Sequence, residues 1–327
     1  MAKRIKIIGT GSYLPEKILT NFDLEKMVET SDQWITERTG IKERRIADDN
    51  TAVSDLMTEA AKNAIEMANI PVEKIDGILV ATVTPDMMFP STACIIQNNL
   101  GIKQGFAFDL SAGCSGFLYA LEVAHNFIAS GKYKNLLVIG GETLSKITNW
   151  SDRNTCVLFG DGAGAAIVTE SNDDSGLLSS VIGAKGEYGD LLYQPAGGSR
   201  MPASKETVEK NLHTIFMNGR EVFNHAVRTM VSAANEALET AGVEGSDISI
   251  FIPHQANVRI MQSTAKRLHI PIEKVFINID KYANTSAGTL PIALDQAVRN
   301  GKIKKGDLIL FDVFGAGLTW GAAVMRW

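Results

Sequence analysis

Cysteine and long apolar runs are scarce in this sequence. Its 327 residues include three cysteines, Cys94, Cys114 and Cys156, which are too few for a disulfide framework or a spaced metal site. The basic start of the chain is interrupted by Lys6 and Gly9 before it forms the apolar core of a signal peptide, and no run elsewhere would cross a bilayer. We therefore expect a reduced, cytoplasmic protein without a metal and without a membrane partner.

Positive charge is not in excess either. Lys and Arg number 32 against 37 Asp and Glu, a formal net charge of −5, which argues against a nucleic-acid partner because such binding requires a basic surface. Any anionic partner must be met by a local basic patch. Hydrophobic residues make up 45% of the chain, enough to build cores, and the length indicates about two domains.

Apolar runs alternate with amphipathic stretches along the whole chain. Because these runs are continuously apolar, they predict strands of a sheet that is covered on both faces, which is α/β architecture. The expected strands are residues 5–8, 78–81, 136–139, 165–168, 248–252, 275–279 and 308–311, and the expected helices are residues 56–68, 117–129, 221–241 and 289–298.

The chain resembles itself at an offset of roughly 170 residues. Residues 60–68 resemble 233–241 and residues 130–134 resemble 300–304, and a strand is expected after each. Two collinear matches indicate two similarly folded halves, which we place at residues 1–174 and 175–327.

The repeat also pairs two single residues. Cys114 lies 17 residues before Gly131, which ends one predicted helix, and Asn284 lies 17 residues before Gly301, which ends the other. A pseudo-twofold pairing of the halves would bring both toward one central site.

Cys114 is the strongest candidate for a catalytic residue. Residues 111–116 read Ser-Ala-Gly-Cys-Ser-Gly directly before a predicted helix, and these small neighbours leave room for a substrate. The free N–H groups and the positive dipole end of a helix N-terminus favour thiolate over thiol, so a nucleophile is favoured over a buried structural cysteine. Cys94 and Cys156 have core-like contexts and receive no role.

Two polar residues of the second half join this cysteine. His254 follows a buried strand in the segment Pro-His-Gln-Ala-Asn, and catalytic groups of α/β sheets gather at the carboxyl ends of strands. Asn284 opens the segment Asn-Thr-Ser-Ala-Gly, where an asparagine is usually only a helix N-cap. Its equivalence to Cys114 favours a functional role. The other four histidines fit structural roles.

Two glycine-rich segments complete the set. Residues 314–321 form a turn between apolar strands, which either points a backbone N–H at an oxyanion or simply closes a tight turn. Residues 160–164 are interpreted as a strand connection. Neither segment fits a phosphate-cradling loop or a dinucleotide fingerprint.

Segments 111–116, 253–257, 284–288 and 314–321 together resemble the β-ketoacyl-[acyl-carrier-protein] synthase III family, the initiating condensing enzymes of bacterial type II fatty acid synthesis. Segments 9–15 and 34–41 extend this resemblance to the start of the chain. The resemblance implies a thiolase-like fold, internally duplicated in five layers (αβαβα), and a homodimer. It also implies an acyltransferase without a cofactor, which converts an acyl-coenzyme A primer, expected to be acetyl-coenzyme A, and malonyl-acyl carrier protein into 3-oxoacyl-acyl carrier protein, coenzyme A and CO2.

The resemblance further implies how the residues act. Cys114 matches the cysteine that becomes acylated, and the backbone N–H groups of Cys114 and Ala316 match the donors that stabilise the oxyanion. His254 and Asn284 match the residues that hold the malonyl thioester oxygen while CO2 departs. Decarboxylation generates the carbanion without a base, so no second catalytic cysteine is needed. A thiolase needs one, and none follows Cys156.

Binding residues are also implied by the resemblance. Those matching the coenzyme A tunnel are Trp34, Arg38, Arg153, Met217, Gly219, Phe223, Ala256 and Asn257, with Trp34 and Arg38 as the pair that sandwiches adenine. Those expected to meet the acidic carrier protein are Gln255, Ala256, Asn257, Val258, Arg259, Lys266 and Arg267. Asn224 stands where some relatives carry a basic residue. Phe89 matches a residue that enters the acyl pocket of the partner subunit.

Three alternatives remain open on the sequence. A synthase-III-like enzyme of secondary metabolism would have the same fold and site. A papain-like cysteine hydrolase has the same chain order of Cys, His and Asn, but its cysteine has aromatic neighbours and its chain is not duplicated. A non-catalytic carrier-protein scaffold is disfavoured because all three polar residues are retained.

Overall fold

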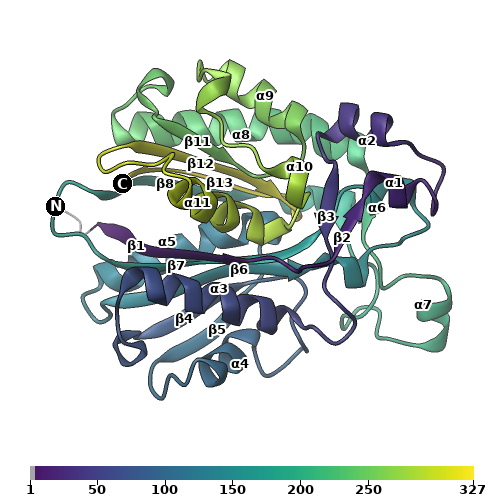
Figure 1. Cartoon of the computed structure of the whole chain (residues 1–327), viewed down its shortest axis with the longest axis horizontal. Coiled ribbons are helices and arrows are strands. Elements are labelled where there is room, and N and C mark those ends of the chain that lie inside the picture. The colour runs from purple at the N-terminus through teal and green to yellow at the C-terminus, as the bar shows by residue number, and fades with distance from the viewer. Residues whose placement is uncertain (1–3) are drawn as a thin grey trace.

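The computed structural model describes residues 4–327 and contains two principal sheets with helices between and around them (Figure 1). In the first sheet the strand order is β1-β7-β6-β4-β5. β4 is parallel to β5 and β6, whereas β7 is antiparallel to β6 and β1. The strands are β1 (Ile5–Tyr13), β4 (Gly77–Ala81), β5 (Phe106–Leu110), β6 (Asn135–Thr143) and β7 (Asp161–Glu170).

The second sheet repeats this arrangement. Its order is β11-β12-β13-β8, in which β11 is parallel to β12 and the next two pairings are antiparallel. The first sheet has the same order of one parallel and two antiparallel pairings in its strands β4-β6-β7-β1. The strands are β8 (Gly176–Ala184), β11 (Ile250–Pro253), β12 (Leu308–Gly315) and β13 (Thr319–Arg326), and two small pairs are β2 (Ile18–Thr20) with β3 (Glu43–Arg45) and β9 (Leu192–Tyr193) with β10 (Phe216–Met217).

Helices form the other three layers (Figure 1). α3 (Val53–Ala68) and α4 (Thr92–Asn99) cover the outer face of the first sheet, and α8 (Gly219–Ala241) and α9 (Val258–Arg267) lie outside the second. α5 (Gly116–Ala129) and α11 (Thr289–Arg299) lie between the sheets. The predicted five-layered αβαβα arrangement is confirmed. Short helices are α1 (Asn21–Leu24), α2 (Asp32–Thr39), α6 (Arg153–Cys156), α7 (Lys205–Glu209) and α10 (Ile279–Tyr282).

One predicted strand is wrong. Residues 275–279 form no strand, and Val275 makes a single parallel bridge to Phe251 before α10 begins at Ile279. This bridge stands where the repeat would place a counterpart of β5, which is parallel to β4. The segment follows a 3₁₀ turn at Ile272–Lys274, so the chain meets the sheet edge only briefly. The other predicted strands and helices are present with shifted ends.

The first half packs a strand against a helix more closely than side chains allow. A Cβ on Gly9 would lie 2.3 Å from the carbonyl oxygen of Ala64, and a Cβ on Gly11 would lie 2.2 Å from that of Ala60. Both alanines are fully buried, so glycine on β1 and alanine on α3 are required together. Among the described residues, no helix is long and apolar enough to span a membrane.

We predict that Gly11→Ala lowers the free energy of unfolding by about 2 kcal/mol or more, because the added methyl group overlaps the α3 backbone. Chemical denaturation measures this change. Gly186→Ala is the matched control, since a Cβ there meets no atom within 4 Å, and we expect an effect within about 0.5 kcal/mol. Equal stability of the two variants would contradict the close packing of β1 on α3.

Candidate active site

Cys114 lies in a tight turn between β5 and α5. Residues Gly113–Ser115 form a 3₁₀ turn, and the φ of Gly113 is +53°, a conformation that favours glycine. The end of β12 packs directly on this turn, since a Cβ on Gly315 would lie 2.7 Å from the backbone nitrogen of Cys114. The cysteine is therefore held where the two sheets' connecting turns meet, and only 8% of its surface is exposed.

Two backbone N–H groups converge on the sulfur of Cys114. One is its own and the other belongs to Ala316, which follows the last residue of β12. The φ of Ala316 is not positive, so alanine fits this position without strain. Converging donors of this kind can hold an oxyanion that develops next to the sulfur.

His254 follows the carboxyl end of β11 and is 3% exposed. Its backbone N–H donates to the carbonyl oxygen of Asp312 at 2.8 Å, and its ring Nδ1 lies 2.7 Å from the hydroxyl oxygen of Thr289. Burial lowers the pKa of His254 to about 3, so the ring is neutral at physiological pH.

Asn284 is fixed by both its backbone and its side chain. Its backbone N–H donates to the carbonyl oxygen of Leu158, and its own carbonyl oxygen accepts the N–H of Gly160. These two bonds make a parallel bridge between Asn284 and Phe159. The side-chain Oδ1 accepts the backbone N–H of Ser286 at 2.8 Å. The amide nitrogen Nδ2 is thus the group left for a ligand, and it can only donate hydrogen bonds.

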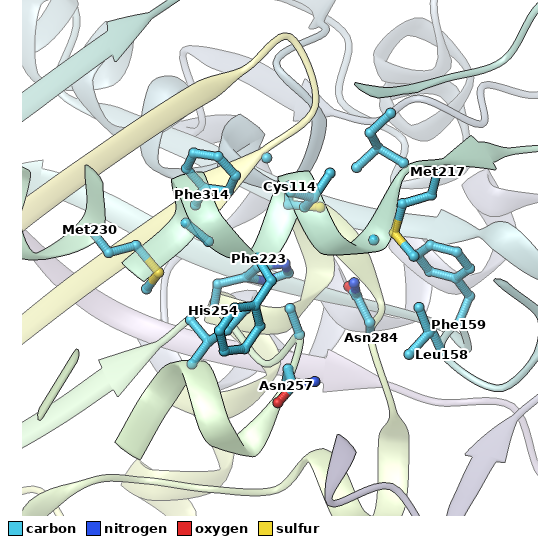
Figure 2. Close-up of a pocket in the computed structure, with 17 residues that line it drawn as sticks. Cys114, Leu158, Phe159, Met217, Phe223, Met230, His254, Asn257, Asn284 and Phe314 are labelled. Carbon is cyan, nitrogen blue, oxygen red and sulfur yellow. The ribbon is translucent and has the colours of Figure 1, made fainter. Parts of the chain in front are cut away.

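These three residues line one buried cavity of about 110 Å³ (Figure 2). The convergence of Cys114, His254 and Asn284 that the sequence predicts is therefore present in the fold. Five of the residues expected along a coenzyme A tunnel line the same cavity: Met217, Gly219, Phe223, Ala256 and Asn257.

A second, mostly apolar cavity of about 150 Å³ also reaches Cys114. It shares Phe159 and Leu192 with the first cavity and lacks His254 and Asn284. A small apolar space next to a nucleophile suits a short hydrocarbon chain. Its further lining includes Val83, Leu144, Ile147, Ile215 and Ser286.

The expected bias of Cys114 toward thiolate is wrong. Burial raises the pKa of the thiol to about 11, and hydrogen bonds from Ser286 and from the two backbone N–H groups offset this only in part. The sequence indicated a helix N-terminus, which lowers a thiol pKa, but it did not indicate that the sulfur is buried. Desolvation has the larger effect on the pKa.

The residue pairing inferred from the repeat also needs a correction. The 3₁₀ turn at Gly113–Ser115 precedes α5, and its counterpart at Ser286–Gly288 precedes α11. Ala287 is therefore the structural equivalent of Cys114, and Asn284 lies just before that turn. Counting back from Gly131 and Gly301 gave a different pairing because α5 has 14 residues and α11 has 11.

Trp34 of α2 is in contact with two guanidinium groups. The Cζ of Arg153 is 4.5 Å from the centroid of the indole ring, and that of Arg38 is 5.4 Å away. Both arginines expected to bind coenzyme A thus lie beside Trp34, and Arg153 is the nearer to its ring. The side-chain amide of Asn257, which lines the cavity, donates to the carbonyl oxygen of Arg38 at 3.0 Å. This bond connects the cavity wall to α2, the helix that carries Trp34.

The predicted carrier-protein residues fall into two groups. Arg259, Lys266 and Arg267 are exposed on α9, while Ala256, Asn257 and Val258 are half-buried where this helix begins. Gln255 is wrong as a docking residue because it is 1% exposed. Its amide nitrogen donates to Pro253 and Phe276, and its oxygen accepts from Asn278, so the side chain holds the loop together.

Phe89 lies away from both cavities of this chain. It is 84% exposed, and its neighbour Met88 is 80% exposed. Such an apolar protrusion is typical of a segment that another surface covers.

Sequence reasoning missed several residues of the site. Phe159 and Phe314 are buried and line the cavity. No motif marked Phe159, and Phe314 opens the segment 314–321 but was given no role of its own. Ser286 and Thr289 make hydrogen bonds with Asn284 and His254. Their position within or next to the segment 284–288 was the available signal.

Duplicated halves of this strand order, with a cysteine at their junction, place the chain among the condensing enzymes of the thiolase fold. Profiles of 3-oxoacyl-[acyl-carrier-protein] synthase III match residues 108–186 and, for its C-terminal part, residues 238–327. The chain is similar to β-ketoacyl-[acyl-carrier-protein] synthase III of Caldanaerobacter subterraneus, with 64% identity over 321 residues. The match covers 98% of this chain and 97% of that protein. The corresponding protein of Clostridioides difficile is 54% identical over 327 residues, covering 100% of this chain and 99% of that protein.

A solved structure agrees with these sequence matches. The crystal structure of 3-oxoacyl-[acyl-carrier-protein] synthase III from Aquifex aeolicus superimposes with a TM-score of 0.92 at 53% identity, covering 99% of this chain and 100% of that one. The chain therefore belongs to the β-ketoacyl-[acyl-carrier-protein] synthase III family and is an acyltransferase.

We predict that alkylation of Cys114 by iodoacetamide accelerates about tenfold per pH unit from pH 7 to pH 10. The thiolate is the reactive form, and a pKa raised to about 11 leaves its fraction rising throughout that range. Mass spectrometry of the Cys114 peptide measures the rate separately from that of the exposed Cys94. Circular dichroism over the same range controls for unfolding, and a rate that levels off near pH 7 would contradict the raised pKa.

Proposed function

We propose that the protein catalyses the decarboxylative condensation of an acyl-coenzyme A primer with malonyl-acyl carrier protein and so initiates type II fatty acid biosynthesis. The products are 3-oxoacyl-acyl carrier protein, coenzyme A and CO2. The observation that carries this proposal is the convergence of Cys114, His254 and Asn284 on one buried cavity in a chain of the synthase III family.

Acylation of Cys114 is the first half-reaction. The sulfur attacks the thioester carbonyl, and the thiol proton leaves with the departing coenzyme A. Negative charge develops on the carbonyl oxygen beside the backbone N–H groups of Cys114 and Ala316, which stabilise it. The bound acyl group occupies the apolar cavity that also reaches Cys114. Acetyl-coenzyme A is proposed as the primer on the family resemblance.

Condensation is the second half-reaction. Asn284 donates a hydrogen bond from Nδ2 to the malonyl thioester oxygen, because Ser286 already holds its Oδ1. A second donor comes from the neutral ring of His254. Loss of CO2 then leaves an enolate whose charge is spread onto this oxygen, and its carbon attacks the acyl-cysteine and expels the Cys114 thiolate. All of these steps use groups of the protein, and we propose that no metal or redox cofactor takes part.

We assign the stacked side chains of Trp34 and Arg153 to the adenine of coenzyme A. The protruding Phe89 supports a homodimer in which this ring fills the acyl pocket of a second copy. The absence of a suitable membrane-spanning helix among the described residues is compatible with action in the cytoplasm.

We predict that Cys114→Ser abolishes labelling of the protein by radiolabelled acetyl-coenzyme A. For His254→Ala and Asn284→Ala we expect acylation within about threefold of wild type and condensation with malonyl-acyl carrier protein reduced by at least about 100-fold. Gel-resolved label and chromatography of the products measure the two half-reactions.

Other outcomes of this experiment identify other functions. Release of the label as free acid indicates a hydrolase, and the absence of labelling of the wild-type protein indicates a scaffold. Equal damage to both half-reactions in the His254 and Asn284 variants would contradict the division of roles.

Carrier-protein docking is assigned to the exposed basic face of α9. Arg259 and Lys266 are seven residues apart and both exposed, so they lie on one face of the helix whose first turn borders the cavity. Arg220 and Arg228 of the neighbouring α8 are also exposed on either side of Asn224. An acidic carrier protein is attracted by this combined surface.

We predict that Lys266→Glu raises the KM for malonyl-acyl carrier protein about fivefold at low salt, and that this difference shrinks as salt is added. The KM for acetyl-coenzyme A is expected to change less than about twofold. Steady-state kinetics at two ionic strengths measure both constants. Lys302→Glu is the control, because Lys302 is exposed before β12, at the end of this strand away from Cys114. An equal effect of both substitutions would exclude α9 as the docking surface.

A further inference from the structure

Glu142 is a fully buried carboxylate that the proposed mechanism does not use. It lies near the end of β6, two residues beyond Gly140, which pairs with Ala81 at the end of the parallel strand β4. The chain leaves the sheet after Ala81, so the backbone N–H groups that follow need other acceptors. The carboxylate of Glu142 is placed to supply them.

One oxygen of this carboxylate, Oε2, binds three consecutive residues. It accepts the N–H of Val83 at 3.0 Å and the hydroxyl groups of Thr82 and Thr84 at 2.9 and 2.7 Å. The N–H of Thr84 is shared between Oε2 at 3.0 Å and the hydroxyl oxygen of Thr82 at 3.1 Å. The hydroxyl oxygen of Thr84 in turn accepts the N–H of Thr143 at 2.9 Å. Residues 82–84 are therefore tied to the end of β6 by hydrogen bonds.

Both of the segments joined in this way line the apolar cavity next to Cys114. Val83 comes from the first and Leu144 from the second. Leu144 is 2% exposed and is held by the packing around it, whereas Val83 is 37% exposed. Packing within the chain thus encloses Val83 only in part, and the position of its side chain depends on the backbone that Glu142 holds.

We propose that Glu142 is a positioning residue that keeps Val83 in the wall of the apolar cavity and thereby limits the length of the acyl chain that the cavity admits. Glu142 lines neither of the two cavities that reach Cys114, so it acts through residues 82–84 rather than on a substrate. The inference rests on the proposed function, because that function assigns the apolar cavity to the acyl primer.

Glu142→Gln tests the inference. A neutral amide oxygen has two lone pairs and the amide nitrogen can only donate, so the donors of residues 82–84 are no longer all satisfied. The quantity to measure is the chain-length ratio, which is the rate constant for acylation of Cys114 by hexanoyl-coenzyme A divided by that for acetyl-coenzyme A. We expect this ratio to rise about tenfold, because Val83 is released from the wall, and the acetyl rate constant to stay within about threefold of wild type.

Mass spectrometry of the intact protein measures both rate constants from the growth of the acyl-enzyme. Burial raises the pKa of Glu142 to about 7, so an assay at pH 8 keeps the wild-type side chain in its carboxylate form.

Thr84→Val gives a second test that leaves the carboxylate in place. It removes the hydroxyl group that donates to Glu142 and accepts from Thr143, and we expect the chain-length ratio to rise about threefold or more. Thr84→Ser restores the hydroxyl group and is expected to stay within about twofold of wild type.

Gly11→Ala is the control for a general loss of stability. It perturbs the contact of β1 with α3, and Gly11 lines neither cavity. We expect its chain-length ratio to stay within about twofold of wild type. Chemical denaturation of all variants shows how far each is destabilised.

The outcomes distinguish this inference from the proposed function. An unchanged or lower chain-length ratio in a folded Glu142→Gln or Thr84→Val protein overturns the role of Glu142 and leaves the function intact. A rise of the same size in Gly11→Ala also overturns it, because the ratio would then report stability alone. Failure of the wild-type protein to be acylated by either coenzyme A ester overturns the proposed function itself, and this inference with it.

Discussion

The site depends on a backbone approach at the centre of the molecule that is closer than any side chain permits. A Cβ on Gly140 of β6 would lie 2.3 Å from the carbonyl oxygen of Ala287, and a Cβ on Gly315 would lie 2.7 Å from the nitrogen of Cys114. These contacts press the turns before α5 and α11, and the end of β12, against one another. The donors that converge on the sulfur therefore come from residues 114 and 316, on opposite sides of the internal repeat. Neither half can form the site alone.

Burial at this junction sets the charge states of Cys114 and His254. Desolvation raises the pKa of the Cys114 thiol to about 11 and lowers that of His254 to about 3. Each shift favours the neutral form, so the cysteine and histidine rest as thiol and imidazole rather than as an ion pair. The cysteine and histidine thus carry no charge of their own, and the site is prepared to stabilise charge that appears on a bound substrate.

Much of this arrangement could be predicted from the sequence, because the signals were local or repeated. Continuously apolar runs marked the strands of a doubly covered sheet, and two collinear matches marked the duplication. Cys114 and His254 stood out by their neighbours, whereas Asn284 was favoured by a pairing in the repeat that the structure corrects. What the sequence did not reveal depends on contacts between distant parts of the chain. Val275 bridges to the sheet at one residue only, and Phe159 borders the cavity because it bridges to Asn284. Gln255 is buried because its side chain bonds to Pro253, Phe276 and Asn278.

In the condensation that we propose, asparagine and histidine suit their places beside the cysteine because of what an enolate oxygen requires. That oxygen accumulates negative charge beside a buried sulfur, so its partners must donate hydrogen bonds without adding a negative charge. Asn284 meets this condition because Ser286 occupies its Oδ1 and leaves Nδ2 as the exposed end of the amide. An aspartate in the same place would present an acceptor oxygen to the enolate oxygen and so repel it. Burial would also disfavour the charged form of the carboxylate. A neutral imidazole meets the condition only when its proton is on the nitrogen that faces the cavity, so its function depends on how the opposite nitrogen is bonded.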